Sequence, residues 1–313
     1  MKPETITASD GHIIQAYVWS HPTPIAWVHI CHGMAEHALR YDHLAQSLVA
    51  QGYAVVAHNH RGHGPSQADT LGHFSDSDGW AKVLSDIETV RTSCTEKHVP
   101  YYMLAHSMGS FIVQSYLTTQ PKDIDGLILS GSNYQNPWVA LAGSYVANME
   151  KWCLGSRRAS KFMDTLSFGS FNKAFKPNRT DFDWLSQDEN QVDLYINDPY
   201  CGFKCTPQLW SDLLSALSRL YRASSFKKIQ NKLPILIISG DKDPVGGYGQ
   251  GLEKLKRAYL AAGQQDVTLK LYSNGRHEIL NETDREQVVN DVVQWLEHHI
   301  ADAVHEEVTQ QQI

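Results

Sequence analysis

The stretch Leu104-Ala105-His106-Ser107-Met108-Gly109 decides how this chain folds. It joins a short apolar run, residues 101–105, to a helix-like run that begins near Ser110. An apolar run of this length predicts a buried strand. A strand that turns directly into a helix forces the serine between them into a strained backbone and exposes its side chain. This is typical of the nucleophile elbow, G-x-S-x-G, in which Ala105 takes the place of the first glycine.

The motif alone leaves an alternative open, because small-x-Ser-x-Gly also arises by chance. In that alternative, Ser107 is an ordinary N-cap residue whose hydroxyl caps the following helix. The positions two before and two after the serine must be small because strand and helix approach closely there, and Ala105 adds one methyl group. The two interpretations are distinguished by whether the other catalytic residues occur at the expected places along the chain.

The composition excludes several classes of protein. The 313 residues are 42% hydrophobic and 19% charged, as in water-soluble globular proteins. The net charge of −7 comes without any block of Lys and Arg, so nucleic acid is not expected as a partner. No run approaches 18 apolar residues, and the N-terminal residues lack the apolar core of a signal peptide. We therefore expect a cytoplasmic protein.

The cysteines do not indicate a metal site or a disulfide framework. There are five, an odd number with irregular spacing, which favours reduced thiols. Cys201 and Cys205 are close in sequence but lack a second cysteine pair or a suitably spaced histidine. The sixteen histidines are scattered along the chain. We expect neither a metal nor an organic cofactor.

Apolar runs alternate with helical patterns through most of the chain. Such alternation predicts an α/β fold with a mostly parallel sheet and helices on both faces. The expected strands are residues 26–31, 53–57, 101–105, 126–130, 233–239 and 267–272, and the expected helices include 38–51, 80–98, 249–262 and 284–301. Residues 135–231 interrupt the pattern with helical signals only. We predict a core formed by residues 1–134 and 232–313, with residues 135–231 inserted as a helical cap.

The predicted cap carries an apolar face at helical spacing from Trp138 through Tyr145 to Trp152. Such a face more often packs against its own domain than against lipid, but on a cap over an active site it can do both. It suggests contact with an acyl chain, and the cap is a candidate for transient contact with the inner face of a membrane. Arg157, Arg158 and Lys161 follow it, and they fit either a phosphate or anionic surface or a solvated charged loop. Trp138 and Tyr145 are therefore candidate substrate-binding residues.

Acyl transfer by a serine requires a base and an acid that orients it, and in this fold they follow in the order serine, acid, histidine. Asp241 and Asp243 come directly after the strand at 233–239, at the edge of the sheet where Ser107 is expected. We favour Asp243, because the acid must reach past the strand end, while Asp241 is the alternative. His277 lies in the turn after the next strand and before the last helix, where the base belongs.

An oxyanion hole needs backbone N–H groups near the nucleophile. One comes from the residue after the serine, Met108, and the other from the loop after an earlier strand. That loop is His32-Gly33-Met34, where Gly33 permits a tight backbone and Met34 supplies the second N–H.

With these residues in place, the sequence resembles the α/β-hydrolase superfamily, and within it the monoacylglycerol lipase and bacterial lysophospholipase branch of serine aminopeptidase S33-type hydrolases. The resemblance covers nearly the whole chain. Its motifs are His32–His37 with Arg40-Tyr41, His60–Ser66, the elbow, the acid loop Gly240–Asp243, Arg276-His277-Glu278 and, in the insert, Thr180–Ser186 and Asp198–Phe203.

The resemblance implies roles for individual residues. Ser107 is the nucleophile, Asp243 the acid and His277 the base, and Met34 and Met108 supply the oxyanion N–H groups. Glu36 and Arg40 match positions that shape the pocket rim near the polar head of the substrate. The alternative interpretation is that the two residues form a surface salt bridge at helical spacing. Gly33 joins Glu36 and Arg40 among the candidate substrate-binding residues.

Two residues depart from the branch pattern. Ala105 replaces the usual glycine, and Asn59 replaces an aspartate that commonly precedes the Arg-Gly-His-Gly turn. Neither change removes a catalytic group.

The expected activity is therefore two-step hydrolysis of a small-molecule acyl ester, an acylglycerol or a lysophospholipid. Two alternatives keep the fold. One retains the triad but cleaves another bond, as an aminopeptidase, thioesterase or other hydrolase would, and the second is a non-catalytic binding protein.

Overall fold

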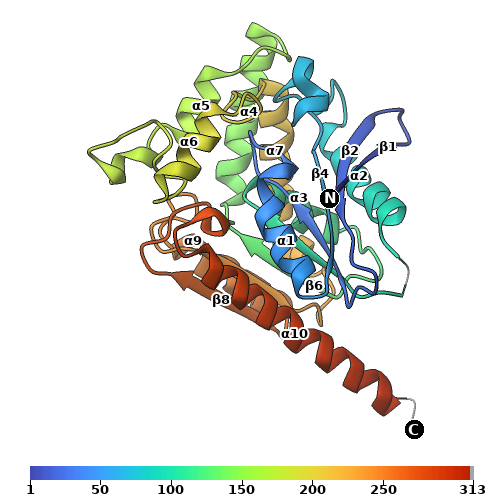
Figure 1. The fold of residues 1–313 in the computed structure, drawn as a ribbon. Coiled ribbons are helices and arrows are strands. Elements are labelled where there is room, and N and C mark those ends of the chain that lie inside the picture. Colours follow the sequence, from blue (N-terminus) through green and yellow to red (C-terminus); the bar gives the residue numbers. More distant parts are fainter. Residues whose placement is uncertain (97, 311–313) are drawn as a thin grey trace.

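A computed structural model describes residues 1–96 and 98–310 of the chain, except for the side chains of residues 302–310. Its centre is one sheet of eight strands in the order β1-β2-β4-β3-β5-β6-β7-β8 (Figure 1). From β4 to β8 all neighbours run parallel. The strands are β1 Lys2–Thr7, β2 Ile13–Trp19, β3 Trp27–Cys31, β4 Ala54–His58, β5 Tyr101–His106, β6 Gly126–Ser130, β7 Ile235–Gly240 and β8 Val267–Tyr272.

Helices cover both faces of this sheet, which confirms the predicted α/β architecture with a mostly parallel sheet. Apolar residues of α1 and α10 pack on one face, and those of α2, α3 and α9 pack on the other. Strands β3 to β7 are buried along their whole length, which is why they appear in the sequence as continuous apolar runs. The helices are α1 Asp42–Ala50, α2 Gly79–Cys94, α3 Met108–Leu117, α9 Gln250–Ala262 and α10 Arg285–Gln310, with short 3₁₀ helices η1 Ala38–Tyr41, η2 Pro65–Thr70 and η4 Ile279–Asn281.

The N-terminal hairpin was not expected from the sequence. β1 pairs antiparallel with β2, and β2 pairs antiparallel with β4, so the hairpin extends the sheet at one edge. β1 (KPETIT) is largely exposed and mostly polar, so it lacks the apolar run that marks the central strands. Sequence periodicity therefore gave no signal for it.

Between β6 and β7 the described residues form helices and loops, with no strand in the range 131–234. Figure 1 shows these helices gathered at one end of the sheet. They are α4 Pro137–Leu154, α5 Lys161–Phe168, η3 Phe171–Phe175, α6 Glu189–Asn197, α7 Pro207–Leu220 and α8 Ala223–Phe226. α7 also contacts α2 and α3, so its apolar side joins the same core as the sheet. The division at residues 134 and 232 stays a prediction.

A buried ion-pair network fixes the hairpin to the core. Arg61, in the turn after β4, donates to Asp86 on α2 at 2.6 and 2.8 Å and to Asp10 of the hairpin turn at 2.7 and 2.9 Å. The side chains of Arg61 and Asp86 are 5% and 3% exposed, whereas Asp10 is partly exposed. One guanidinium thus connects three segments of the chain.

We expect Arg61→Ala to lower the free energy of unfolding by about 3–5 kcal/mol, because it leaves the Asp86 carboxylate buried without its partner. Urea denaturation measures this loss. The matched control is Arg91→Ala, which breaks a more exposed pair with Glu88 and should cost no more than about 1 kcal/mol. Equal losses in the two variants would contradict the burial argument.

Candidate active site

Ser107 occupies the sharp turn between β5 and α3. Its φ of 49° and ψ of −119° lie in a region that side-chain-bearing residues rarely adopt. Ser107 stands at the N-cap position of α3, but its side chain makes no capping hydrogen bond. Its Oγ instead lies 3.0 Å from Nε2 of His277. The N-cap alternative for this hydroxyl is therefore wrong.

His277 lies between the serine and a buried carboxylate. Its Nδ1 is 3.0 Å from Oδ1 of Asp243, which is fully buried. Asp243 also accepts hydrogen bonds from the Ser239 hydroxyl and from the Val245 N–H, each at 2.8 Å. These two donors leave Asp243 aimed at the imidazole, so Ser107, His277 and Asp243 have the connectivity of a catalytic triad.

The structure places Asp243, and not Asp241, against the histidine. Asp241 accepts a hydrogen bond from the N–H of Asn274 at 2.8 Å and also pairs with Lys242. It therefore holds the turn that follows β8. Both carboxylates leave the end of β7, and the loop geometry determines which one reaches His277.

The loop after β3 packs directly on the nucleophile. A Cβ built on Gly33 would lie 3.2 Å from Cβ of Ser107 and 2.7 Å from Oε1 of Glu36, so a side chain here would crowd both residues. Met34 lines the cavity in front of Ser107. Met108 is the first residue of α3, where an N–H has no acceptor within the helix. The N–H groups of Met34 and Met108 stay our predicted oxyanion donors.

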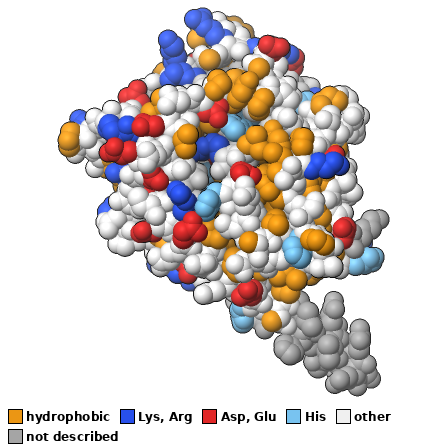
Figure 2. Space-filling model, in the orientation of Figure 1, with side chains coloured by type: hydrophobic (Ala, Val, Ile, Leu, Met, Phe, Trp, Pro, Cys, Tyr) orange, Lys and Arg blue, Asp and Glu red, His pale blue; other side chains and the backbone are white. Residues whose placement is uncertain are grey.

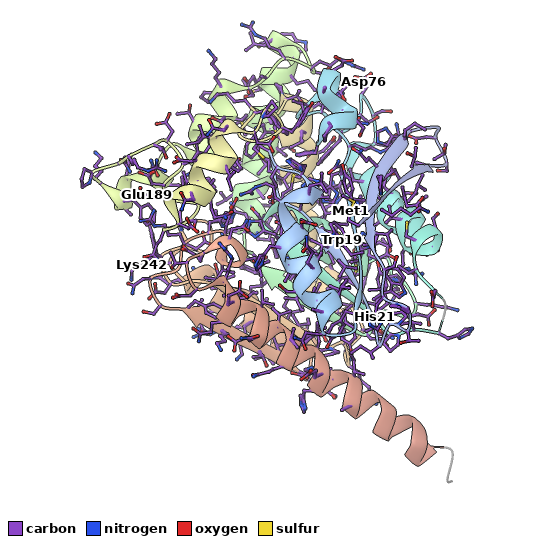
Figure 3. The ribbon with its side chains drawn as sticks, in the orientation of Figure 1. Met1, Trp19, His21, Asp76, Glu189 and Lys242 are labelled. Carbon is purple, nitrogen blue, oxygen red and sulfur yellow. The ribbon has the colours of Figure 1, made fainter. Side chains whose placement is uncertain are left out.

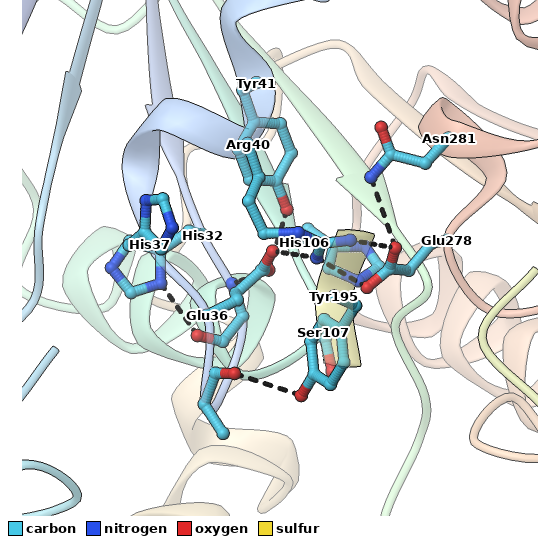
Figure 4. Close-up of polar contacts among 12 residues, drawn as sticks. His32, Glu36, His37, Arg40, Tyr41, His106, Ser107, Tyr195, Glu278 and Asn281 are labelled. Carbon is cyan, nitrogen blue, oxygen red and sulfur yellow. Dashed lines mark hydrogen bonds and ion pairs between the residues drawn. The ribbon is translucent and has the colours of Figure 1, made fainter. Parts of the chain in front are cut away.

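Glu36 and Arg40 belong to a buried network beside this loop (Figure 4). Glu36 accepts hydrogen bonds from the Gly33 N–H at 2.5 Å and from the Tyr41 hydroxyl at 2.9 Å. Arg40 donates to Glu36 at 2.7 Å and binds both carboxylate oxygens of Glu278 at 2.6 Å. The side chains of Glu36, Arg40 and Glu278 are each less than 10% exposed, so the surface salt bridge that we considered is wrong. The network ties the oxyanion loop to the loop that carries the histidine.

A cavity of about 280 Å³ opens in front of Ser107 and His277. Gly33 and Glu36 line it from the core, and residues between α5 and α7 line it from the cap. The principal aromatic and aliphatic lining residues are Phe168, Phe182, Trp184, Leu185, Tyr195 and Phe203. Sequence reasoning assigned none of these residues to the substrate, although Phe182, Trp184, Leu185 and Phe203 lie within the two cap motifs quoted above.

Three candidate substrate-binding residues lie elsewhere. Trp138 and Tyr145 on α4 are 77% and 64% exposed and do not line the cavity. The buried residues of α4 are instead small, including Ala140 and Ala147, because this side packs closely on α7. The bulky face that we assigned to the acyl chain therefore points outward. Arg40 is also absent from the cavity wall, since its guanidinium binds the two carboxylates of the network.

The cap is hydrogen-bonded to the loop that carries the histidine. The backbone N–H groups of His277 and Glu278 donate to the carbonyls of Trp184 and Leu185, at 3.4 and 2.8 Å. The buried carboxylate of Glu282 accepts backbone N–H groups from both segments, at residues 187 and 276. The Trp184 ring also lies 5.1 Å from the His277 ring. The cap thus helps to fix the position of His277.

The two departures from the branch pattern have local explanations. The Asn59 amide accepts the Ala38 N–H at 2.9 Å and donates to Oε1 of Gln15 at 3.2 Å. An aspartate lacks the second function, because a carboxylate has no proton to donate. Ala105 is fully buried between Cys31 and Leu129 of the neighbouring strands, where its methyl group fits the sheet.

The charges around His277 suit a general base. Burial opposes protonation of the ring, but the carboxylate of Asp243, with those of Glu278 and Glu36, outweighs it and raises the pKa of His277 above the usual 6.5. Burial likewise opposes ionisation of Asp243, yet the histidine and its hydrogen-bond donors lower the pKa of this carboxyl. The pair therefore favours a charged carboxylate that stabilises an imidazolium.

Comparison with known proteins gives consistent relatives over nearly the whole chain. A family model described as serine aminopeptidase, S33, matches residues 22–284. The monoglyceride lipase of Rattus norvegicus is 30% identical over 308 residues, which cover 96% of this chain and 91% of that protein. The monoacylglycerol lipase of Mycolicibacterium smegmatis is 29% identical over 289 residues, which cover 90% and 92% of the two chains.

Among solved structures, a thermostable carboxyl esterase from Bacillus coagulans in complex with glycerol is similar over 96% of this chain and 98% of its own. The TM-score is 0.88 at 26% sequence identity. The superfamily and the branch that we inferred from the motifs are confirmed by these relatives.

We expect Ser107→Ala to lower kcat for a nitrophenyl ester by roughly 10⁴-fold or more, because it removes the attacking oxygen. Asp243→Asn should also lower kcat strongly, whereas Asp241→Asn should cost far less because Asp241 only holds a turn. Steady-state kinetics on the folded variants measure these losses. The reverse order of the two aspartate variants would identify Asp241 as the acid.

The pH dependence provides a separate prediction. The base works as neutral imidazole, so kcat/KM should fall as the pH drops through a pKa above 6.5. Asp243→Asn removes the charge that raises this pKa while burial still lowers it, so the acid limb should move to lower pH. Profiles of kcat/KM with an uncharged ester measure the shift, and Asp241→Asn is the control. An acid limb that stays in place in Asp243→Asn would argue against the assigned pair.

Proposed function

This chain belongs to the serine aminopeptidase S33 family of the α/β-hydrolases, and we propose that it is a carboxylic ester hydrolase acting on acylglycerols or lysophospholipids through an acyl-enzyme. The observation that carries the proposal is the hydrogen-bonded chain Ser107–His277–Asp243 facing a cavity walled by the cap. The lipase and esterase relatives support the choice of an ester bond.

In the proposed mechanism, Nε2 of His277 takes the proton of the Ser107 hydroxyl as Oγ attacks the ester carbonyl. The N–H groups of Met34 and Met108 stabilise the resulting oxyanion. His277 then gives its proton to the leaving alcohol, and an acyl-enzyme remains on Ser107. A water molecule, deprotonated by the same imidazole, cleaves the acyl-enzyme and restores the hydroxyl.

Acidic residues near the cavity are the groups that would bind the free amine of an aminopeptidase substrate. An aminopeptidase needs an acidic group that binds the substrate ammonium, and Glu36 is the acidic residue nearest to the oxyanion loop. Its carboxylate is already bound by Arg40, Tyr41 and the Gly33 N–H. Asp183 accepts hydrogen bonds within the cap, whereas Asp164 and Asp181 line the cavity. The choice of an ester over an aminoacyl substrate is therefore supported by the lipase and esterase relatives.

We further propose that the cap approaches a lipid surface from the cytoplasmic side. Trp152 on α4 is 88% exposed, and Figure 2 shows hydrophobic and basic side chains near each other at the cap end of the molecule. Arg157 pairs with Asp76 at 2.6 Å, near the outer end of the molecule in Figure 3, so part of the basic charge is already neutralised. No helix in the described part of the chain is long and apolar enough to cross a membrane.

A substrate panel tests the ester assignment. We expect hydrolysis of monoacylglycerols and lysophospholipids, and of nitrophenyl esters, at rates well above those for aminoacyl anilides. Ser107→Ala is the background control. A clear preference for the anilides would overturn the proposal in favour of an aminopeptidase. Failure of a fluorophosphonate probe to label folded wild-type protein would instead indicate a binding protein without catalytic activity.

A further inference from the structure

A cluster of metal-ligating side chains lies where the cap meets the core, outside the triad. It consists of His37, next to the oxyanion loop, and of Asp198 and Cys201, in the loop after α6. One ligand atom from each residue lies within 4.8 Å of the others. The sequence gave no sign of this cluster, because His37 lies 161 residues before Asp198 along the chain.

The three residues are held near one another by contacts of their own. Nε2 of His37 lies 2.8 Å from Oδ2 of Asp198. Asp198 ends α6, and the Cys201 N–H donates to its carbonyl at 3.1 Å, so a tight turn holds the thiol near the carboxylate. The next residue, Gly202, donates its N–H to the Ala35 carbonyl at 2.9 Å, which fixes this turn to the core loop. The donors are therefore assembled without a cation.

Solvent reaches the cluster from one side. The nearby carboxylates of Glu36 and Glu278 are paired with Arg40, so Asp198 is the carboxylate that stands beside the Cys201 thiol. Asp198 keeps a 28% exposed side chain, so an ion can reach the cluster from solvent.

One polar atom of the cluster also lacks a partner. Nδ1 of His37 is buried and makes no hydrogen bond within the part of the chain that the structure describes. The ring is thus oriented by its single polar contact, with Asp198.

We propose that His37, Asp198 and Cys201 bind a divalent transition-metal cation of the zinc type. Imidazole nitrogen, carboxylate oxygen and thiolate sulfur are the ligands that zinc uses, and three protein ligands leave the fourth tetrahedral position to water. The cation binds the Cys201 sulfur as thiolate, and the thiol proton is released to solvent. The site joins the cap to the core beside the cavity, and it is independent of the function proposed above.

A second cluster of possible metal ligands is a weaker candidate for the site. His29, Cys31 and His58 also lie within ligand distance of one another, on neighbouring strands. All three are fully buried in the sheet, and both ring nitrogens of His29 are already hydrogen-bonded, to Tyr101 and to His58. An ion would have to displace these bonds and cross the core, so we assign the site to the cap junction.

Cobalt provides a readout that does not depend on activity. We expect Co²⁺ added to the reduced full-length protein to produce a thiolate-to-cobalt charge-transfer band and the intense visible bands of tetrahedral cobalt. Both should saturate at one equivalent of Co²⁺ per protein. Zn²⁺ should displace it stoichiometrically. C201S should abolish the charge-transfer band, and D198N and H37A should each weaken binding by at least about tenfold, since even outer-sphere partners of metal ligands contribute 10–100-fold.

The matched control is C153S, which removes an exposed thiol of α4 outside the cluster and should leave the band unchanged. Far-ultraviolet circular dichroism establishes that each variant is folded. If C201S or H37A does not fold, D198N, the mildest of the three changes, is measured in its place. Absence of the band from wild type at millimolar Co²⁺, its persistence in C201S, or its loss in C153S would each overturn the assignment.

Discussion

The strained turn at Ser107 is the constraint on which the rest of the site depends. A positive φ at a residue with a side chain costs about 1–3 kcal/mol, so surrounding contacts must enforce it. The Ser107 N–H donates to Ser130 of β6 at 2.9 Å, and the Ser110 hydroxyl holds its carbonyl at 2.6 Å. A Cβ on Gly109 would lie only 2.3 Å from the Cys31 carbonyl oxygen, which shows how closely α3 approaches β3. Three strands and a helix must therefore be in place before Oγ can meet His277.

The parts of the fold that were predictable are those in which local chemistry and burial agree. Trp27–Cys31 and Ile235–Gly240 are buried on both faces, so each appears in the sequence as an unbroken apolar run. Polar residues in the loop after such a run, such as Asp243, come to the functional edge of a parallel sheet. Strand β1 escaped prediction because an exposed edge strand needs no such run, whereas the mostly buried apolar run of β2 was present in the sequence but was not recognised as a strand.

The rest of the site depends on contacts between distant segments. Arg40 and Glu278 are 238 residues apart, and His37 and Asp198 are 161 apart, so no spacing rule relates them. The outward orientation of Trp138 is a similar case. A helical stripe shows that one side of α4 is apolar, but the close packing of α4 on α7 selects its small residues for burial and leaves the tryptophan outside.

The hydrogen bonds between residues 184–187 and the loop of His277 make the two halves of the cap unequal. One half is built into the frame that holds the base, whereas α4 meets the rest of the protein mainly through α7. A chimera that exchanges the whole insert between relatives would thus replace part of the catalytic framework together with the substrate wall. Grafting α4 and α5 alone, while the native segment from residue 180 onward is retained, separates specificity from the geometry of the base.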